Sequence, residues 1–236
     1  MPSHRPRLLD RVRWRLAAGG EPPDDDAAGN LAWNRRRWGQ ARGWAALDGY
    51  GYAWGGGYAQ AASAVSRLAD DHLRPHLGRR YDLKVLELSP GAGRFTAELI
   101  RYARELVLVD MNASAVAICR ERFRYYPTPI RTVVNDGRDL GAITDRDFDL
   151  CACYDSMVHM HPEIVEGYVT QMAERLAPGG VLWLDHSGRG SREEGHRTDV
   201  TAEWMAELAA RLDLEVVDQW FRNDWDCVSV LRAPGA

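Results

Sequence analysis

The feature that most constrains this chain is a regular alternation of strand-like and helix-like segments after residue 61. Five short apolar runs are spaced widely enough to leave room for a helix between each pair, and they cover residues 84–89, 106–110, 130–136, 148–155 and 180–186. Because strands that alternate with helices pair in parallel, this pattern predicts a parallel sheet with helices on both faces.

The predicted helices have apolar residues at helical spacing, and they cover residues 61–77, 93–105, 113–126, 162–180 and 201–213. Two further apolar runs, 214–221 and 227–233, lie close enough in the sequence to pair as an antiparallel hairpin at a sheet edge. We therefore predict an α/β fold with a Rossmann-like, mostly parallel seven-stranded sheet and a C-terminal antiparallel hairpin.

Residues 1–60 differ from the rest of the chain. An Arg-rich start predicts a short basic helix, and the Pro- and Asp-rich stretch 21–30 predicts a linker after it. An aromatic, Gly-rich segment follows, and we expect its Tyr50, Tyr52 or Trp54 to close over a pocket as a lid. Packing of these rings on the flank of the domain is the equal alternative. We predict two parts, an N-terminal extension over 1–60 and a catalytic domain over 61–236.

Composition narrows the class of protein. Of the 236 residues, 45% are hydrophobic and 27% charged, which is typical of a globular chain, and the net charge of -4 argues against a nucleic-acid partner. No apolar run approaches the ~18 residues of a membrane helix, so we expect no membrane partner. The four cysteines form no C-x-x-C pair, which predicts buried thiols in a reducing, cytoplasmic setting. A transit peptide or a membrane-surface helix at the N-terminus is the lesser alternative.

Ligands of such sheets bind beyond the carboxyl ends of the strands. The first end carries Glu87, followed by a turn in which Gly91 and Gly93 let the backbone approach a ligand closely. Thr96 stands where a dinucleotide fingerprint has its third glycine, which argues against a pyrophosphate site.

The next two strand ends also carry carboxylates. Asp110 closes the second strand, where a carboxylate can accept hydrogen bonds from a ribose diol, and Met111 can lie against an adenine. Asp136, followed by Gly137, could accept a hydrogen bond from the adenine amino group. For this third end, an ordinary turn is the favoured alternative.

The fourth and fifth strand ends carry Asp155, His159 and His186, which parallel topology brings to one rim. Imidazole titrates near neutral pH, so His159 is the first candidate for a general base and His186 the second. Hydrogen-bonded structural histidines are the equal alternative. A divalent metal at these residues is a lesser alternative, because no tight ligand spacing is present, and we predict no metal site.

In order and spacing, the motifs VLELSPGAGRFTAEL, LVLVD, NDGRDL, FDLCACYDSMVHM and LAPGGVLWLDH resemble those of class I S-adenosylmethionine-dependent methyltransferases. The resemblance covers roughly residues 61–233. It implies S-adenosylmethionine as the cofactor, bound by residues at the first four strand ends, which are Glu87, Gly91, Gly93, Arg94, Asp110, Met111, Asp136, Gly137 and Tyr154.

A narrower resemblance rests on YDSMVH, DHSG, the pair His196-Arg197 and the pair Asp226-Cys227. These are similar to a bacterial subgroup found with sugar, antibiotic and other natural-product biosynthesis, which implies His196 as a substrate contact. The segment DHSG more often reads His-His-Ser-Asn in that subgroup, so Asp185 and Gly188 depart from its pattern.

The sequence thus predicts methyl transfer from S-adenosylmethionine to an amine or hydroxyl of a small polar metabolite, with His159 or His186 as the base and Asp155 beside it. The alternatives are a nicotinamide-dependent oxidoreductase and a non-catalytic methyltransferase-fold partner subunit. The expected partner is a small-molecule acceptor, and a homodimer is left open.

Overall fold

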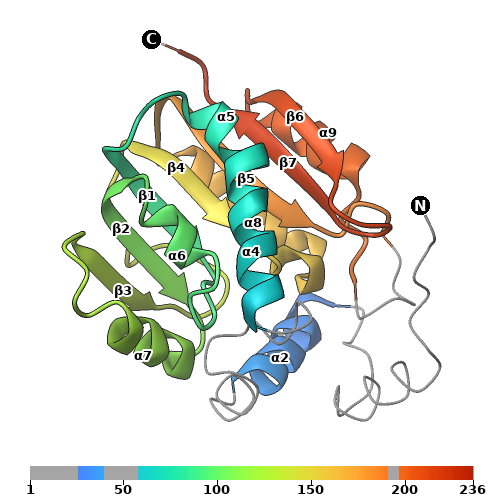
Figure 1. The fold of residues 1–236 in the computed structure, drawn as a ribbon. Helices are drawn as coiled ribbons and strands as arrows, with labels where there is room; N and C mark the ends of the chain where they lie inside the picture. The colour runs from blue at the N-terminus through green and yellow to red at the C-terminus, as the bar shows by residue number, and fades with distance from the viewer. Residues whose placement is uncertain (1–25, 40–57, 191–196, 236) are drawn as a thin grey trace.

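The computed structural model describes residues 26–39, 58–190 and 197–235. Their strands form a seven-stranded sheet of order β3-β2-β1-β4-β5-β7-β6 (Figure 1). The strands are β1 Leu83–Leu88, β2 Ala103–Asp110, β3 Ile130–Val134, β4 Phe148–Cys153, β5 Leu176–His186, β6 Glu215–Phe221 and β7 Cys227–Arg232. β1 to β5 pair in parallel, whereas β7 runs antiparallel to both β5 and β6. The predicted fold class and the C-terminal hairpin are confirmed.

Helices cover both faces of this sheet, with α4 and α6 on one face and α8 on the other (Figure 1). The α-helices are α2 Ala27–Trp38, α4 Tyr58–Leu68, α5 Arg74–Leu77, α6 Thr96–Leu99, α7 Ala113–Arg122, α8 Pro162–Ala173 and α9 Ala202–Arg211. A π-helical turn, Ala69–Leu73, joins α4 to α5. Among the described residues, no helix is long and apolar enough to cross a membrane.

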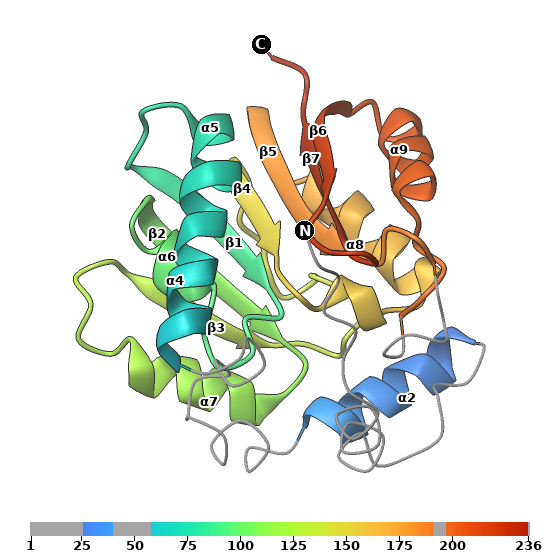
Figure 2. The ribbon, with the colours of Figure 1, turned by 45° about the vertical axis from the view of Figure 1, so that its right-hand side comes forward.

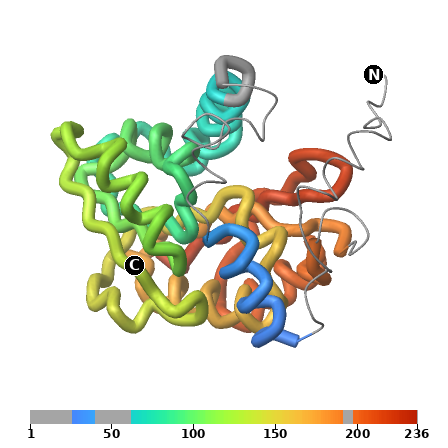
Figure 3. Tube along the Cα trace, turned by 90° about the horizontal axis from the view of Figure 1, so that it is seen from below, coloured from blue at the N-terminus to red at the C-terminus, as the bar shows by residue number. Residues whose placement is uncertain are grey.

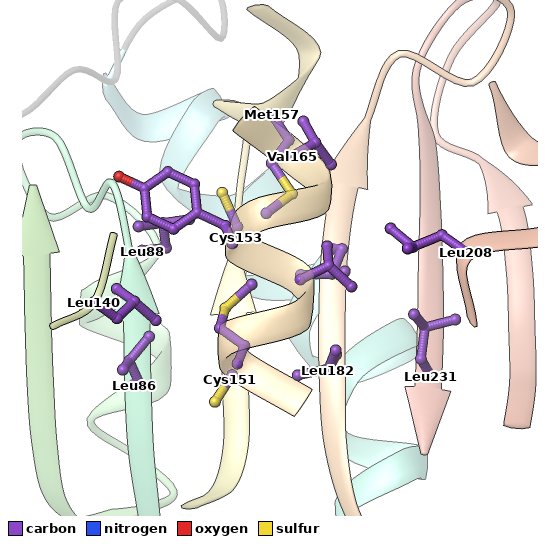
Figure 4. Packing of buried hydrophobic residues seen from close by; sticks show 14 of the residues in the cluster. Leu86, Leu88, Leu140, Cys151, Cys153, Met157, Val165, Leu182, Leu208 and Leu231 are labelled. Atoms are coloured by element: carbon purple, nitrogen blue, oxygen red, sulfur yellow. The ribbon is translucent and has the colours of Figure 1, made fainter. Parts of the chain in front are cut away.

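The alternation of side chains along the strands produces a hydrophobic core on each face. Leu86 and Leu88 pack with α8 and α9 on one side, whereas Val85 packs with α4 to α7 on the other. Figure 4 shows the first of these cores, in which Cys151 and Cys153 lie among leucines as buried free thiols. These two cysteines therefore serve as small apolar side chains, as the sequence predicts.

Three predicted helices are too long at their C-terminal ends, and the one expected over 113–126 ends at Arg122. The helix expected over 93–105 is limited to α6, because β2 already begins at Ala103, which pairs with Leu83 of β1. The helix expected over 162–180 ends at Ala173, and β5 begins at Leu176. In the last two cases, pairing with a neighbouring strand takes residues that helical spacing alone assigns to the preceding helix.

The expected linker 21–30 is also wrong in its second half, which begins helix α2. The side chain of Asp26 accepts a hydrogen bond from the amide of Gly29 and so caps this helix. α2 lies across the end of the sheet toward which the parallel strands point (Figure 2), and the view onto that end shows it crossing there (Figure 3). The proposed lid residues Tyr50, Tyr52 and Trp54 lie outside the described residues.

Candidate active site

The loop after β1 adopts a backbone conformation that ordinary residues avoid. Ser89, Gly91 and Gly93 have φ angles of 55°, 55° and 81°. At Gly93 a side chain is also excluded by space, because a Cβ atom would lie 2.5 Å from Cε2 of Phe123. The glycine therefore allows a tight turn that leaves backbone amides, rather than side chains, at the end of β1.

Glu87 lies at this strand end as a buried carboxyl group, with only 1% of its surface exposed. The hydroxyl of Thr96 donates a hydrogen bond to its Oε2 at 2.6 Å. Burial raises the pKa of Glu87 to about 8, although the bond from Thr96 opposes the shift. Thr96, which stands where a dinucleotide fingerprint has its third glycine, therefore forms a hydrogen bond with this carboxyl group.

Asp110, at the end of β2, is a second buried carboxylate. Its Oδ1 accepts the amide of Asn112 at 2.8 Å, and its Oδ2 accepts the amide of Gly91 at 3.3 Å. Burial raises the pKa of Asp110 to about 6, against these hydrogen bonds. Two neighbouring strand ends thus carry carboxyl groups, which favours a ligand with hydroxyl or cationic groups over a polyphosphate.

At the end of β3, Asp136 forms the turn that was the favoured alternative. Its Oδ1 accepts the amides of Arg138 and Asp139 at 2.8 and 3.1 Å. Gly137 has a φ of 87°, and a Cβ atom there would lie 2.5 Å from Cδ1 of Leu31 and 3.1 Å from Sδ of Met111. Met111 and Leu31 of α2 therefore both lie against the Gly137 turn.

Helix α2 is the element of the site that sequence reasoning missed. Arg35 donates a hydrogen bond to the carbonyl of Asp136 at 2.7 Å, which ties the helix to the end of β3. Asn30 and Asn34 are buried, and their amide groups lie 3.0 and 2.9 Å from the carbonyl oxygen of His159. α2 therefore contacts both the β3 end and the loop that carries the first candidate base.

Asp155, after β4, is held by two guanidinium groups. Oδ2 contacts Arg94, and Oδ1 accepts from Arg222 at 2.9 Å. Burial alone would raise the pKa of Asp155, but Arg222 and Arg94 outweigh it and lower the pKa to about 2. With both oxygens engaged, Asp155 has the environment of an ion-pair partner rather than of a base or a metal ligand. Arg94, expected at the cofactor, is its partner here.

The same cluster extends to the end of β5. Arg222 contacts Oδ2 of Asp185 at 3.0 Å, and burial raises the pKa of Asp185 to about 7 although Arg222 opposes the shift. The ring of Tyr154 lies under both arginines, with centroid distances of 4.9 Å to Arg94 and 5.3 Å to Arg222. Asp185, which departs from the subgroup's pattern, thus has Arg222 as its ionic partner.

His186, the second candidate base, is fully buried in the structure. Its Nε2 lies 2.8 Å from the hydroxyl of Ser229, and its Nδ1 lies 3.3 Å from the carbonyl of Val200. Burial lowers the pKa of His186 to about 4. Both nitrogens are engaged away from solvent, so the geometry favours a structural role in the sheet over proton transfer.

His159, the first candidate base, is half-buried in a short 3₁₀ turn, Met157–His159. Its ring stacks on Trp38 of α2, with 5.3 Å between centroids and 30° between planes, and it lies 6.2 Å from the ring of Trp33. Its charge contributes to the lowered pKa of Asp155. The structure therefore leaves His159 partly exposed against helix α2, whereas His186 lies inside the sheet.

The segment after β5 is fastened to the neighbouring elements. Arg197 donates two hydrogen bonds to Asp226, from Nε at 2.5 Å and from the guanidinium Nη2 at 2.8 Å. The amide of Thr198 donates to the carbonyl of Val158 at 3.2 Å. A Cβ atom at Gly188 would lie 2.3 Å from that of Cys227, which explains the absence of a larger residue there. His196 itself lies outside the described residues.

The described part of the chain contains no group of three or more His, Cys, Asp and Glu side chains arranged to hold a metal ion. Asp155, His159 and His186 do not form such a group, because Asp155 binds arginines and His186 binds Ser229.

Residues 85–180 match the model of a family described as a methyltransferase domain. The chain contains a methyltransferase domain. The N-methyltransferase NodS from Bradyrhizobium japonicum WM9, in complex with S-adenosyl-L-homocysteine, is structurally similar with a TM-score of 0.61 and 19% identity, over 89% of this chain and 100% of that one. No curated protein matches the chain.

Two further solved structures resemble the methyltransferase domain and its surroundings. An S-adenosylmethionine-dependent methyltransferase from Clostridium acetobutylicum ATCC 824 has a TM-score of 0.61 and 15% identity, over 74% of this chain and 92% of that one. The 4+2 cyclase SpnF has a TM-score of 0.61 and 14% identity, over 75% of this chain and 82% of that one. At such identities the likeness shows the fold alone, and the domain match carries the activity.

The domain match over residues 85–180 indicates a methyltransferase, for which the sequence motifs imply S-adenosylmethionine as the cofactor. The residues at the strand ends fit this cofactor. Asp110 is a buried carboxylate suited to a ribose diol, Glu87 is suited to a cationic group, and Met111 with Leu31 forms an apolar contact suited to a base. The tight turn at Gly93 leaves room for a ligand to approach the backbone closely.

Proposed function

We propose that this methyltransferase transfers the methyl group to a hydroxyl or an amine of a small polar metabolite, in the manner of the sugar and natural-product subgroup. The observation that carries the proposal is the pair of buried carboxyl groups, Glu87 and Asp110, on either side of the positive-φ turn at Gly91 and Gly93. A site lined by carboxyl groups, with no basic side chain among these residues, suits a sulfonium donor.

The proposed donor site lies at the ends of β1 to β4. Its residues are Glu87, Gly91, Gly93, Asp110, Met111, Asp136 and Gly137, with Arg94 and Tyr154 at its boundary with the acceptor. When bound, the cofactor supplies an electrophilic methyl group. Asp110 accepts hydrogen bonds from the ribose, and Asp136 accepts one from the adenine. Alignment and exclusion of water then account for most of the rate, because charge disperses in such a displacement.

His159 is the proposed general base. A hydroxyl or ammonium acceptor must lose a proton, and an imidazole at the rim can take it near neutral pH. The charge of Asp155 interacts with that of His159, although Arg94 and Arg222 hold both of its carboxylate oxygens. His186 and Asp155 are less suitable, since hydrogen bonds and ion pairs occupy them. NodS is described as an N-methyltransferase, so the proposal includes an amine acceptor.

The two alternative functions are not favoured. A nicotinamide-dependent oxidoreductase would need a pyrophosphate site, whereas Thr96 binds Glu87 where the third glycine would be. A non-catalytic partner subunit has no need of the buried carboxyl groups at the donor site. We further propose that the protein is a cytoplasmic bacterial enzyme, either a monomer or a homodimer. Its acceptor is a free small molecule.

A methyl-transfer screen with radiolabelled S-adenosylmethionine tests this function against sugars, amino sugars and nucleosides. With an acceptor found in the screen, His159→Ala should lower turnover by roughly two to four orders of magnitude and leave donor binding nearly intact. The matched control is His161→Ala, two residues along the same loop, whose imidazole only accepts the amide of Glu163 at the start of α8. Equal turnover in His159→Ala and the wild type would remove His159 as the base.

A further inference from the structure

Asn30 and Asn34 are unusual for helix α2, because both side chains are buried, with 2% and 5% of their surface exposed. A buried amide must find hydrogen-bond partners, and both of these side chains reach a carbonyl on a distant part of the chain, that of His159. The Oδ1 atom of Asn30 accepts the amide of His161 at 3.0 Å, and its Nδ2 donates to the carbonyl of His159 at 3.0 Å. The side chain of Asn30 thus bridges two positions of one loop.

Asn34 contacts the same carbonyl and also fixes an aromatic ring. Its Nδ2 lies 2.9 Å from the carbonyl oxygen of His159 and 3.1 Å from Oδ1 of Asn30. Its Oδ1 accepts the indole N–H of Trp38 at 3.2 Å. The ring of Trp38 in turn stacks on the imidazole of His159. One side chain therefore holds both the backbone of His159 and the ring that packs against its imidazole.

The imidazole has few ways to turn while these contacts persist. Its backbone is fixed by two amide groups, and one face of its ring is covered by Trp38. Trp33 lies against it at a tilt, and Asp155 is the carboxylate whose charge interacts with it. Because a general base must meet the proton that it removes within hydrogen-bond reach, a fixed ring orientation bears directly on turnover.

We propose that Asn34, together with Asn30, is a positioning residue that sets the orientation of the His159 imidazole in this enzyme. The proposal rests on the function of His159 as the base, and it adds helix α2 to the machinery of methyl transfer. α2 also contacts the end of β3 through Leu31 and Arg35, so the helix joins the donor side of the site to the His159 loop.

The test uses Asn34→Asp, which has nearly the same shape. The new side chain can still accept the indole N–H of Trp38, but it has no N–H group to donate to the carbonyl of His159. The matched control is Arg36→Ala, an exposed position on the same helix. The readout is the ¹H–¹³C resonance of the His159 ring in the full chain, assigned by its loss in His159→Ala. It is recorded with S-adenosylhomocysteine and compared with kcat and KM.

We expect the His159 resonance to move in Asn34→Asp and to stay in place in Arg36→Ala. With the acceptor from the screen, kcat should fall ten- to a hundredfold while the affinity for S-adenosylhomocysteine changes less than threefold. A purely structural role would lower the folded fraction and leave the resonance of the folded molecules where it was. An unmoved resonance, or an unchanged kcat, in folded Asn34→Asp overturns the proposal. Full turnover of His159→Ala would instead overturn the assignment of the base.

Discussion

The affinity of this methyltransferase for S-adenosylhomocysteine should fall as the pH is lowered through 6. In the ligand-free protein, burial raises the pKa of Asp110 to about 6. If the ribose hydroxyls donate hydrogen bonds to Asp110, they favour its ionised form, so ligand binding lowers this pKa. Below pH 6 the free protein then carries a proton that must leave before the ligand binds, and the affinity decreases.

The size of the effect follows from the ionised fraction of Asp110. At pH 7 the carboxyl group is mostly ionised, and the loss of affinity is about 10%. At pH 5 about one molecule in eleven is ionised, so the dissociation constant should rise about tenfold, which is about 1.4 kcal/mol. Below this pH the affinity falls a further factor of about ten per unit until the pKa of the bound form is reached.

Isothermal titration calorimetry between pH 5 and 7 measures this dependence, and buffers of different ionisation enthalpy report the released proton. The control is Asp110→Asn, which cannot ionise and should bind with a weaker but nearly constant affinity over the same range. A wild-type affinity that is the same at pH 5 and pH 7, with no proton release, would refute the placement of the ribose on Asp110.

Three other changes have expected outcomes. Burial raises the pKa of Glu87 to about 8. The ligand-free protein should therefore lose thermal stability as the pH rises from 6.5 to 8.5, and Glu87→Gln should lose less. Thermal unfolding measures both. Gly137→Ala places a Cβ atom against Leu31 at a positive φ and should weaken S-adenosylhomocysteine binding about five- to tenfold in a titration, whereas unchanged binding would separate this contact from the donor site. Arg222→Ala leaves the buried Asp185 without its ionic partner and should cost about 3–5 kcal/mol in urea unfolding, and a cost below about 1 kcal/mol would contradict the role of this ion pair.

The sheet could be predicted because the pattern that indicates each strand lies within the residues of that strand. The apolar runs at VLEL and LVLVD are buried strands that need no knowledge of their neighbours, and the two C-terminal runs are close enough to pair only as a hairpin. The start of β2 at Ala103 was not predictable, because pairing with Leu83 takes these residues from the preceding helix. Whether a segment forms a helix or a strand thus follows from its periodicity, whereas the residues at which it begins and ends depend on partners elsewhere in the chain.

The candidate site divides in the same way. Glu87 and Asp110 lie at strand ends, so their burial follows from the pattern that reveals the strands. The residues around Asp155 in the sequence do not indicate that Arg222, 67 residues later, forms an ion pair with it. The environment of His186 likewise depends on Ser229, which lies on β7, far along the sequence, and forms a hydrogen bond with its ring.

Helix α2 escaped prediction for a related reason. Its buried residues include Asn30 and Asn34, which in a sequence are typical of loops and exposed faces. Their partners are backbone groups near His159, about 130 positions away, and no periodicity can reveal such a contact. The capping residue Asp26 was the one local signal, and it stood within a run that otherwise indicates a linker.

The most direct test of the account is a calorimetric titration of the wild type and of Asp110→Ala with S-adenosylhomocysteine at pH 7.5. We expect one site in the wild type and an affinity about thirtyfold lower in the variant, on the order of 2 kcal/mol, as is typical of lost hydrogen bonds to a charged group. Equal affinity in the two proteins, or no binding to the wild type, would contradict a donor site at the ends of β1 and β2.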